Sequence, residues 1–233
     1  MIAIIDYKMG NVRSVAKAFE TVGAVVSVTA SVSKLRKAKA LVLPGVGAFP
    51  AGMKNVRALG LIPEIRRAVC GQKPFLGICL GMQLLFTSSE EHGVHQGLNL
   101  ISGDVVRFRS NLKIPHMGWN TLQKTAKTNA EGRRTRDEKG IMSLSARELM
   151  SNKLSENDLL EGIPEGAYFY FVHSYYVKPA QRNVILATSE YGRKFACVVG
   201  KGNTFGIQFH PEKSAELGLK IIENFCRIAG EIA

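Results

Sequence analysis

The sequence predicts an α/β fold with a mainly parallel sheet, and three observations carry that prediction. Short apolar runs alternate with amphipathic stretches over the first 80 residues, which is typical of strands and helices that build a parallel sheet with helices on both faces. From about residue 99, strand-like segments follow one another with fewer helices, so we expect added antiparallel strands in the second half. The 233 residues, 45% of them hydrophobic, can fill one core, and no linker or repeat divides them, so we predict a single domain, 1–233.

The individual elements follow from hydrophobic spacing. Residues 11–23 predict a helix, because Val12, Val15, Phe19 and Val22 share one face and Gly23 ends it. The last predicted helix, 214–230, carries a similar apolar stripe that packs on the sheet. A helix is also expected at 60–70, and strands are expected at 1–6, 24–30, 74–78, 100–108, 167–177, 183–190, 195–202 and 203–210. Residues 39–49 are expected to begin as a strand and to break into a glycine-rich loop.

The amino-acid composition limits the classes of function that the chain can have. The formal net charge of +12 and a pI near 9.7 suit a polyanionic partner, although the basic cluster at 132–140 lacks interleaved aromatic residues and is most simply a surface loop. No apolar run approaches the roughly 18 residues of a membrane span, and the N-terminus lacks the features of a signal peptide. We therefore expect a cytoplasmic protein without membrane contact. The four cysteines are irregularly spaced, which predicts neither a disulfide framework nor a zinc site.

One cysteine stands in a distinctive setting. Gly77, Cys79 and Gly81 form a G-x-C-x-G pattern where an apolar strand turns into a helix, the cysteine counterpart of a nucleophile elbow. The glycines allow a sharp turn, the helix start favours a thiolate, and the N–H of Leu80 points to where an oxyanion would develop. A buried structural cysteine is the competing interpretation.

A base for that nucleophile is available near the C-terminus. His210 and Glu212 close the last predicted strand, and in an extended segment both side chains leave on the same side, so Glu212 can hold the imidazole of His210. Pro211 between them fixes φ. A plain turn explains His-Pro-Glu equally well when it is taken alone, but a nucleophile and its base explain the two motifs together.

A glycine-rich loop follows another predicted parallel strand, at residues 44–47. Ligands collect at the carboxyl ends of such strands, so this loop is the candidate for a second oxyanion donor. The alternative is an ordinary strand-to-helix turn.

These motifs occur together and in order: PGVGAF, GICLGMQLLF, FVHSYY and QFHPEKS. In that combination the chain resembles the class I glutamine amidotransferases. PHMGWN at 115–120, the opening D-Y-x-M-G-N at 6–11 and YFVHSYYV resemble, within that family, the glutaminase subunits of imidazole glycerol phosphate synthase, of histidine biosynthesis. The resemblance implies a flavodoxin-like sheet and hydrolysis of glutamine through a thioester, without cofactor or metal.

The resemblance also implies residue roles. Cys79 is the nucleophile, His210 the general base and then acid, and Glu212 orients His210. The oxyanion hole is formed at Val46, Gly47 and Leu80, and glutamine is held by Gln83, Glu91, Ser174 and Tyr175. For Gln83 and Glu91 the alternative is an exposed helix face, and for the strand around Ser174 it is a buried aromatic strand.

A partner is implied as well, because free ammonia is lost to water. In the family this partner is a (β/α)8 cyclase subunit that binds a phosphorylated nucleotide and forms imidazole glycerol phosphate together with a purine precursor. The expected docking residues, on a loop that includes PHMGWN and near the opening motif, are Asn11, His116, Met117 and Trp119. The alternative is a packed turn in which Trp119 anchors the core.

The sequence departs from the family pattern at two places, and two other functions remain possible. Lys8 replaces a small residue, and 124–159 is longer than expected, which predicts a surface insertion. The chain could supply ammonia to another synthase, such as one that aminates a surface-polysaccharide sugar, or could be a non-catalytic scaffold or nucleic-acid-binding module. His92 and His95 have metal-compatible spacing but no cysteine companions, so we predict no metal.

Overall fold

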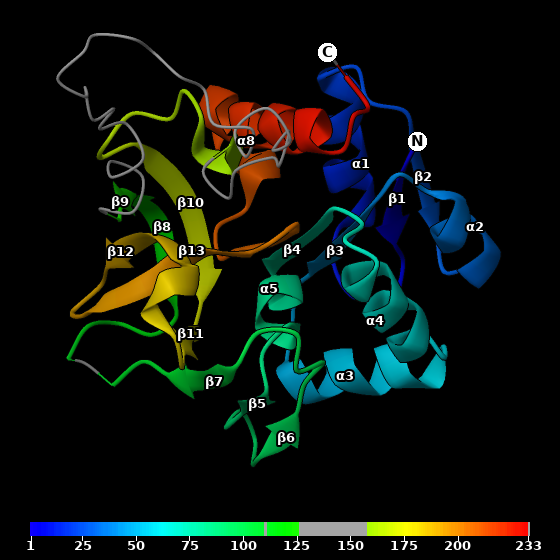
Figure 1. Cartoon of the computed structure of the whole chain (residues 1–233). Coiled ribbons are helices and arrows are strands. Elements are labelled where there is room, and N and C mark those ends of the chain that lie inside the picture. The colour runs from blue at the N-terminus through cyan, green and yellow to red at the C-terminus, as the bar shows by residue number, and fades with distance from the viewer. Residues whose placement is uncertain (110, 126–157, 233) are drawn as a thin grey trace, which may run out of the picture.

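The computed structural model describes residues 1–109, 111–125 and 158–232 and is built around an eight-stranded sheet (Figure 1). Five neighbouring strands run parallel, and the remaining three extend the sheet in antiparallel fashion. This arrangement confirms the predicted mainly parallel sheet with antiparallel additions from the second half of the chain. In spatial order the strands are β2 (Val26–Thr29), β1 (Ile2–Ile5), β3 (Ala40–Gly45), β4 (Phe75–Cys79), β14 (Thr204–Ile207), β13 (Lys194–Lys201), β12 (Ile185–Glu190) and β9 (Gln123–Lys124).

Helices cover both faces of the parallel strands (Figure 1). The period-2 alternation of β1 explains this: Ile2 and Ile4 belong to one buried cluster, while Ala3 and Ile5 belong to the other. One cluster contains side chains of α1 (Val12–Thr21) and α8 (Ala215–Ile228); the other contains side chains of α2 (Val32–Lys37), α3 (Phe49–Ala58) and α4 (Ile62–Cys70).

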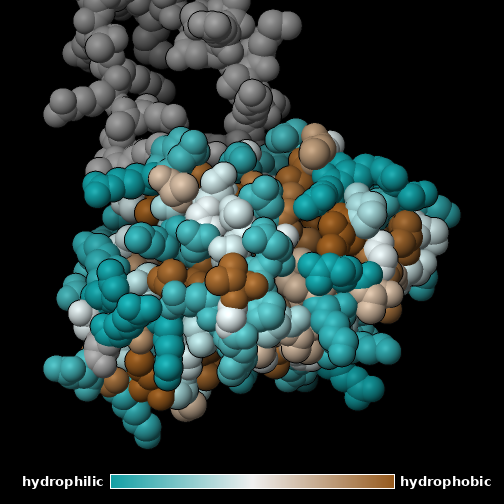
Figure 2. Space-filling model, turned by 90° about the horizontal axis from the view of Figure 1, so that it is seen from below, coloured by the Kyte–Doolittle hydropathy of each residue, from teal (hydrophilic) through white to brown (hydrophobic). Residues whose placement is uncertain are grey.

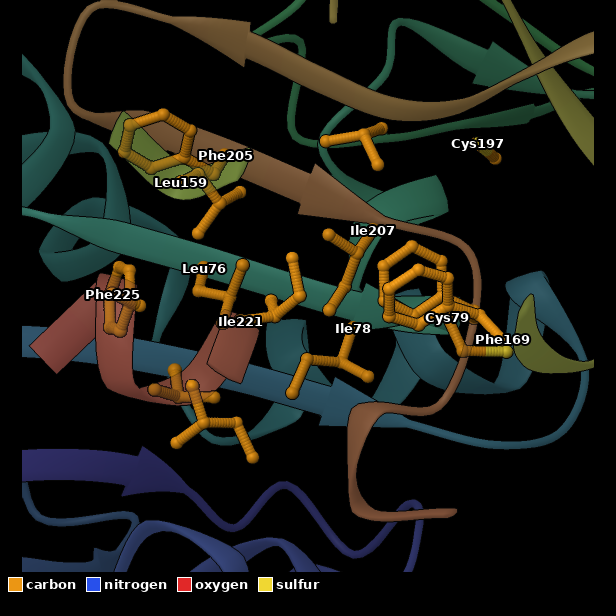
Figure 3. Close-up of a cluster of buried hydrophobic side chains, with 14 of the residues drawn as sticks. Leu76, Ile78, Cys79, Leu159, Phe169, Cys197, Phe205, Ile207, Ile221 and Phe225 are labelled. Carbon is orange, nitrogen blue, oxygen red and sulfur yellow. The ribbon is translucent and has the colours of Figure 1, made fainter. Parts of the chain in front are cut away.

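Figure 3 shows the cluster on the α8 side, where Leu76 and Ile78 of β4 lie among Ile207, Ile221 and Phe225. Each of these side chains is at most 1% exposed. Complete burial of one such side chain stabilises the fold by roughly 1.5–3 kcal/mol. Cys79 lies where this apolar row ends, so the core fixes the strand that carries the thiol.

Strands between residues 88 and 179 form two small sheets beside the large one. Their strands are β5 (Ser88–Ser89), β6 (His95–Gln96), β7 (Gly103–Arg107) and β11 (Tyr175–Pro179) in one, and β8 (His116–Thr121) and β10 (Tyr168–His173) in the other. Among the described residues, the remaining helical elements are α5 (Leu80–Leu84) and the short 3-10 turns η1 (Asp158–Leu160), η2 (Arg182–Val184) and η3 (Pro211–Lys213).

Two local expectations differ from the structure, and two helices occur that the sequence does not predict. Residues 116–120 of PHMGWN lie in strand β8, paired with β10, and not in a loop. The single strand expected at 167–177 is two strands, β10 and β11, which lie in different sheets with Ser174 between them. Helices α2 and α3 were not expected. Most of the predicted insertion 124–159 lies outside the described residues. Among the residues that the structure describes, no helix combines the length and apolar character that crossing a membrane requires.

Candidate active site

Cys79 occupies the turn between β4 and α5, as the glycine spacing predicts. It is the last residue of the strand and precedes the helix, with φ 53° and ψ −110°. This is a strained conformation for a residue with a side chain. A Cβ on Gly77 would lie 2.7 Å from the carbonyl oxygen of Gly81, so the flanking glycines make the tight turn possible. The thiol is 6% exposed.

His210 and Glu212 form a buried pair. The imidazole Nδ1 of His210 lies 2.9 Å from Oε1 of Glu212, and their side chains are 3% and 4% exposed. The predicted contact is therefore present, but its geometry differs from the prediction: Glu212 lies in turn η3 and not in an extended strand. The backbone of His210 is held on both sides, since its N–H donates to the carbonyl oxygen of Tyr170 at 2.9 Å and its carbonyl accepts the hydroxyl of Ser214 at 2.6 Å.

The electrostatics favour a charged imidazole. Burial by itself lowers the pKa of His210, but the interactions with the Cys79 sulfur and the Glu212 carboxylate outweigh burial and raise that pKa to about 10. The other ring nitrogen, Nε2, is buried without a nitrogen or oxygen partner among the described residues. This nitrogen is therefore available to exchange a proton with the sulfur or with a bound ligand.

A cavity of about 240 Å³ opens beside the thiol. Its size is at the small end for ligand pockets and suits a molecule such as an amino acid. Adjacent ends of two parallel strands create it, because Gly45 of β3 is the register partner of Cys79. Its lining includes every residue that the sequence assigns to the oxyanion hole and to substrate binding, together with Cys79: Val46, Gly47, Leu80, Gln83, Glu91, Ser174 and Tyr175.

Two of these residues are fixed by hydrogen bonds. Oε2 of Glu91 accepts the N–H of Phe49 at 2.7 Å, which ties the carboxylate to the start of α3. Nε2 of Gln83 donates to the carbonyl oxygen of Tyr175 at 3.1 Å and to Oε1 of Gln208 at 3.2 Å. Gln83 is 5% exposed, so the alternative of an exposed helix face is wrong for this residue.

The four expected docking residues separate into two groups. Trp119 and Met117 are 53% and 62% exposed, so Trp119 does not anchor the core. Asn11 is exposed, and its Oδ1 accepts the N–H of Ser14 at 3.2 Å as the N-cap of α1. His116, in contrast, is 3% exposed and stacks on Tyr191, so its side chain belongs to the interior and cannot contact a partner in this conformation.

The rings around Trp119 form an amphipathic surface. Trp119 meets Tyr170 edge to face at 6.2 Å, and Nζ of Lys213 lies 5.7 Å from the centre of the Tyr170 ring. The neighbouring strand exposes Tyr168 by 59%. Figure 2 shows the molecule from below, with separate hydrophobic areas among hydrophilic ones on that face. Exposed aromatic and cationic groups of this kind are typical of protein–protein contacts.

Three buried residues of the predicted motifs were not assigned a role. Gln208 and Ser214 belong to the predicted QFHPEKS motif, and Tyr7 belongs to the opening motif. The Tyr7 hydroxyl has no hydrogen-bond partner among the described residues, and burial together with the nearby Cys79 raises its pKa. The signal that could have identified them is the presence of polar side chains within otherwise buried strand ends.

The pair of histidines at 92 and 95 shows no metal-binding geometry. Nε2 of His95 lies 3.2 Å from the carbonyl oxygen of His92. Within the described ranges, no three His, Cys, Asp or Glu side chains are placed to hold a metal ion together.

Comparison with known proteins identifies the family. The profile of Glutamine amidotransferase class-I matches residues 3–229. The chain is 45% identical to the imidazole glycerol phosphate synthase subunit HisH of Desulfitobacterium hafniense (strain DSM 10664 / DCB-2), over 100% of this chain and 97% of the relative. It is 44% identical to that of Aquifex aeolicus (strain VF5), over 98% and 97%. The chain belongs to the class I glutamine amidotransferases, in the HisH family.

Solved structures share the amidotransferase fold. A crystal structure of a glutamine amidotransferase covers 98% of both chains with a TM-score of 0.68 at 18% identity. The glutaminase domain of Trypanosoma brucei CTPS with bound acivicin covers 100% of this chain and 94% of its own, with a TM-score of 0.63 at 14% identity. At these identities the likeness shows the fold. The predicted flavodoxin-like amidotransferase fold is confirmed.

Proposed function

We propose that this chain is the glutaminase subunit of an imidazole glycerol phosphate synthase, in which Cys79 hydrolyses glutamine and the ammonia passes to a cyclase subunit for histidine biosynthesis. The observation that carries the proposal is the arrangement of Cys79, His210 and Glu212 beside a cavity of about 240 Å³. Full-length similarity to HisH subunits supports the assignment to this synthase.

In the first step, the Cys79 thiolate attacks the side-chain amide carbon of glutamine. The imidazolium of His210 then gives its Nε2 proton to the leaving nitrogen, ammonia departs, and a glutamyl thioester remains. In the second step, His210 takes a proton from water, whose oxygen attacks the thioester carbonyl and releases glutamate and the thiolate. Glu212 keeps the imidazole oriented, because its carboxylate accepts the Nδ1–H in both steps.

Both steps form a tetrahedral intermediate whose oxygen carries a negative charge. The N–H of Leu80, in the first turn of α5, is one donor for that charge, and the loop at Val46 and Gly47 supplies the other. The remaining cavity residues hold the amino-acid end of the substrate: Gln83 and Glu91 attract the ammonium group, and the segment Ser174–Tyr175 accompanies its backbone. Because both Nε2 hydrogens of Gln83 are occupied within the protein, Oε1 is its group left for the ligand.

The partner is a cyclase subunit that receives ammonia directly, since ammonia released to water at neutral pH becomes ammonium and loses its nucleophilicity. Met117 and Trp119 on β8, together with Asn11 of the opening motif, are the proposed docking residues. The buried position of His116 removes it from this set.

Glutamate release from glutamine tests the proposal. The purified chain is assayed alone, with a (β/α)8 cyclase of the synthase, and with that cyclase and its nucleotide ligand; Cys79→Ala is the blank. We expect a large increase in the presence of the liganded partner, absent in Cys79→Ala. If a complex forms without any increase, the chain supplies another synthase or has no catalytic role.

A further inference from the structure

Gln208 is a fully buried polar residue that contacts the reacting sulfur. It follows the last residue of β14, is 0% exposed, and its backbone N–H donates to the carbonyl oxygen of Cys197 at 2.9 Å. Its side-chain Nε2 lies 3.6 Å from Sγ of Cys79, within the range of an N–H···S hydrogen bond. A buried side-chain amide needs hydrogen-bond partners, and the thiol is one of them.

The direction of this hydrogen bond follows from the backbone carbonyl of Tyr175, which is linked to Gln208 through the side chain of Gln83. A backbone carbonyl only accepts, so the atom of Gln83 that lies 3.1 Å from the oxygen of Tyr175 is its amide nitrogen. The second hydrogen of that nitrogen points to Oε1 of Gln208 at 3.2 Å. Gln208 must therefore present its own nitrogen, and hence a hydrogen, to the sulfur of Cys79.

The carbonyl of Tyr175 is itself held in place by a second chain of hydrogen bonds. It accepts Nδ1–H of His173 at 2.8 Å, and Nε2 of His173 lies 3.0 Å from Nδ1 of His116. Burial lowers the pKa of His173 to about 3 and that of His116 to about 4, so both rings are neutral near pH 7. His173 Nε2 then accepts from His116, whose Nε2 accepts from Nδ2 of Asn120 at 3.1 Å. The carbonyl oxygen of Tyr175, which orients Gln83, is thus also held by the ring of His173.

A donor at the sulfur favours the thiolate over the thiol. The carbonyl oxygen of Val172, 3.9 Å from Sγ, has the opposite effect, because it can accept a hydrogen bond only from the thiol. The charge of His210 also favours the thiolate. The amide of Gln208 opposes the effect of the Val172 carbonyl.

We propose that Gln208 stabilises the Cys79 thiolate by donating its Nε2–H to Sγ, and that Gln83 acts as a positioning residue that fixes the orientation of this donor. The importance of this thiolate for glutamine hydrolysis rests on the proposed function. The inference about the thiol itself does not, because the reactivity of Cys79 can be measured without glutamine or a partner.

The test is the rate of alkylation of Cys79 by iodoacetamide between pH 5 and 10, in the full chain with Cys70→Ser, which removes the exposed cysteine. Peptide mass spectrometry identifies Cys79 as the modified site. Gln208→Met keeps the side-chain length and removes the donor. We expect the pH midpoint of alkylation to shift upward, with a rate at pH 7 lower by about 3- to 10-fold. Gln83→Met should shift the midpoint in the same direction by less.

Thr204→Val is the matched control, because Thr204 is a buried polar residue at the opposite end of β14. It should leave the midpoint unchanged. A folded Gln208→Met chain with the midpoint of the parent overturns the proposal. If Gln208→Met does not fold, Gln83→Met decides in the same way. A shifted midpoint in a chain that shows no glutaminase activity in any complex would support this inference and reject the proposed function.

Discussion

Gly81 packs so closely against Leu43 that a Cβ at position 81 would lie 1.7 Å from the Leu43 carbonyl oxygen. Gly81 lies in α5 and Leu43 in β3, so this contact seats the helix that follows Cys79 directly on the neighbouring strand. The clash would involve backbone on both sides and cannot be relieved by a rotamer change. We expect Gly81→Ala to lower the free energy of unfolding by about 3 kcal/mol or more, as overpacking in a core does.

Urea denaturation followed by circular dichroism measures this loss. Gly71→Ala is the control, since Gly71 has φ −78°, is exposed, and a Cβ there would come no closer than 3.2 Å to its neighbours. That change should stay within about 1 kcal/mol of the parent. Equal losses in the two variants would contradict the proposed role of the Gly81–Leu43 contact.

Because the backbone of Cys79 is strained, we expect the usual order of stability of an alanine and a glycine variant to be reversed at this position. Glycine normally destabilises a regular element relative to alanine by roughly 0.5–1 kcal/mol. At φ 53° and ψ −110°, however, alanine keeps the strain and glycine relieves it. We expect Cys79→Gly to be more stable than Cys79→Ala by about 1 kcal/mol, measured by thermal and urea unfolding under identical conditions. The opposite order would mean that the turn is not strained by a side chain.

The sequence predicts the parts of the site that local backbone geometry determines. Gly77 and Gly81 report the turn at Cys79 because only glycine fits there, and His210 with Glu212 are close along the chain in any compact conformation. The reason given for that pair was wrong, since η3 and not an extended strand brings the two side chains together. The contact was nevertheless predicted correctly, because residues only two positions apart in the sequence lie close together in most backbone conformations.

Contacts between distant segments could not be predicted in the same way. The chain from Cys79 through Gln208 and Gln83 to Tyr175 depends on β14 lying beside β4, which hydrophobic spacing does not specify. Helix α3 was missed because Pro50 and Gly52 disturb its helical pattern, and α2 has only six residues. The break at Ser174 separates two strands that both carry aromatic side chains, so no Gly or Pro marks the place where one strand ends and the other begins.

The exposed Trp119 predicts a surface that is dispensable for folding and required for docking. Trp119→Ala should leave the free energy of unfolding within about 1 kcal/mol of the parent, because 53% of this residue is exposed. It should weaken binding of the cyclase subunit by about tenfold or more, as loss of an aromatic anchor does. Isothermal titration calorimetry measures the affinity. Val25→Ala, which removes an apolar group that is 63% exposed at the β2 edge of the sheet, should leave it unchanged.

The buried histidines predict acid sensitivity. The pKa of His173 is lowered to about 3 and that of His116 to about 4 by burial, whereas the unfolded chain binds these protons near pH 6.5. As pH falls below about 6.5, the unfolded state takes up protons that the folded state does not, so stability is present above this pH and decreases below it. Each residue contributes a slope of up to about 1.4 kcal/mol per pH unit.

Urea unfolding between pH 7 and 4 tests this expectation. His173→Gln should show a shallower decrease in the free energy of unfolding than the parent, even though its stability at pH 7 is lower. His92→Gln changes an exposed histidine and should keep the parent slope. Equal slopes in the parent and in His173→Gln would show that His173 is protonated to the same extent in the folded and the unfolded chain.

Glu212 predicts a pH dependence of the opposite sign. The pKa of His210 is raised to about 10, so its contribution to stability is fully present below about pH 6.5 and is lost as pH rises through 10. Glu212→Gln removes one of the two groups that raise this pKa. The variant should lose less stability between pH 6.5 and 10 than the parent, and the slopes of the two chains should differ by at most about 1.4 kcal/mol per pH unit.

The glutaminase activity of Glu212→Gln in the complex should fall by about 10²- to 10⁴-fold, because the imidazole is no longer held for proton transfer. Glu216→Gln, an exposed change in the first turn of α8, should preserve both the activity and the slope. If Glu212→Gln lowered activity without changing the slope, the carboxylate would orient the imidazole without setting its charge.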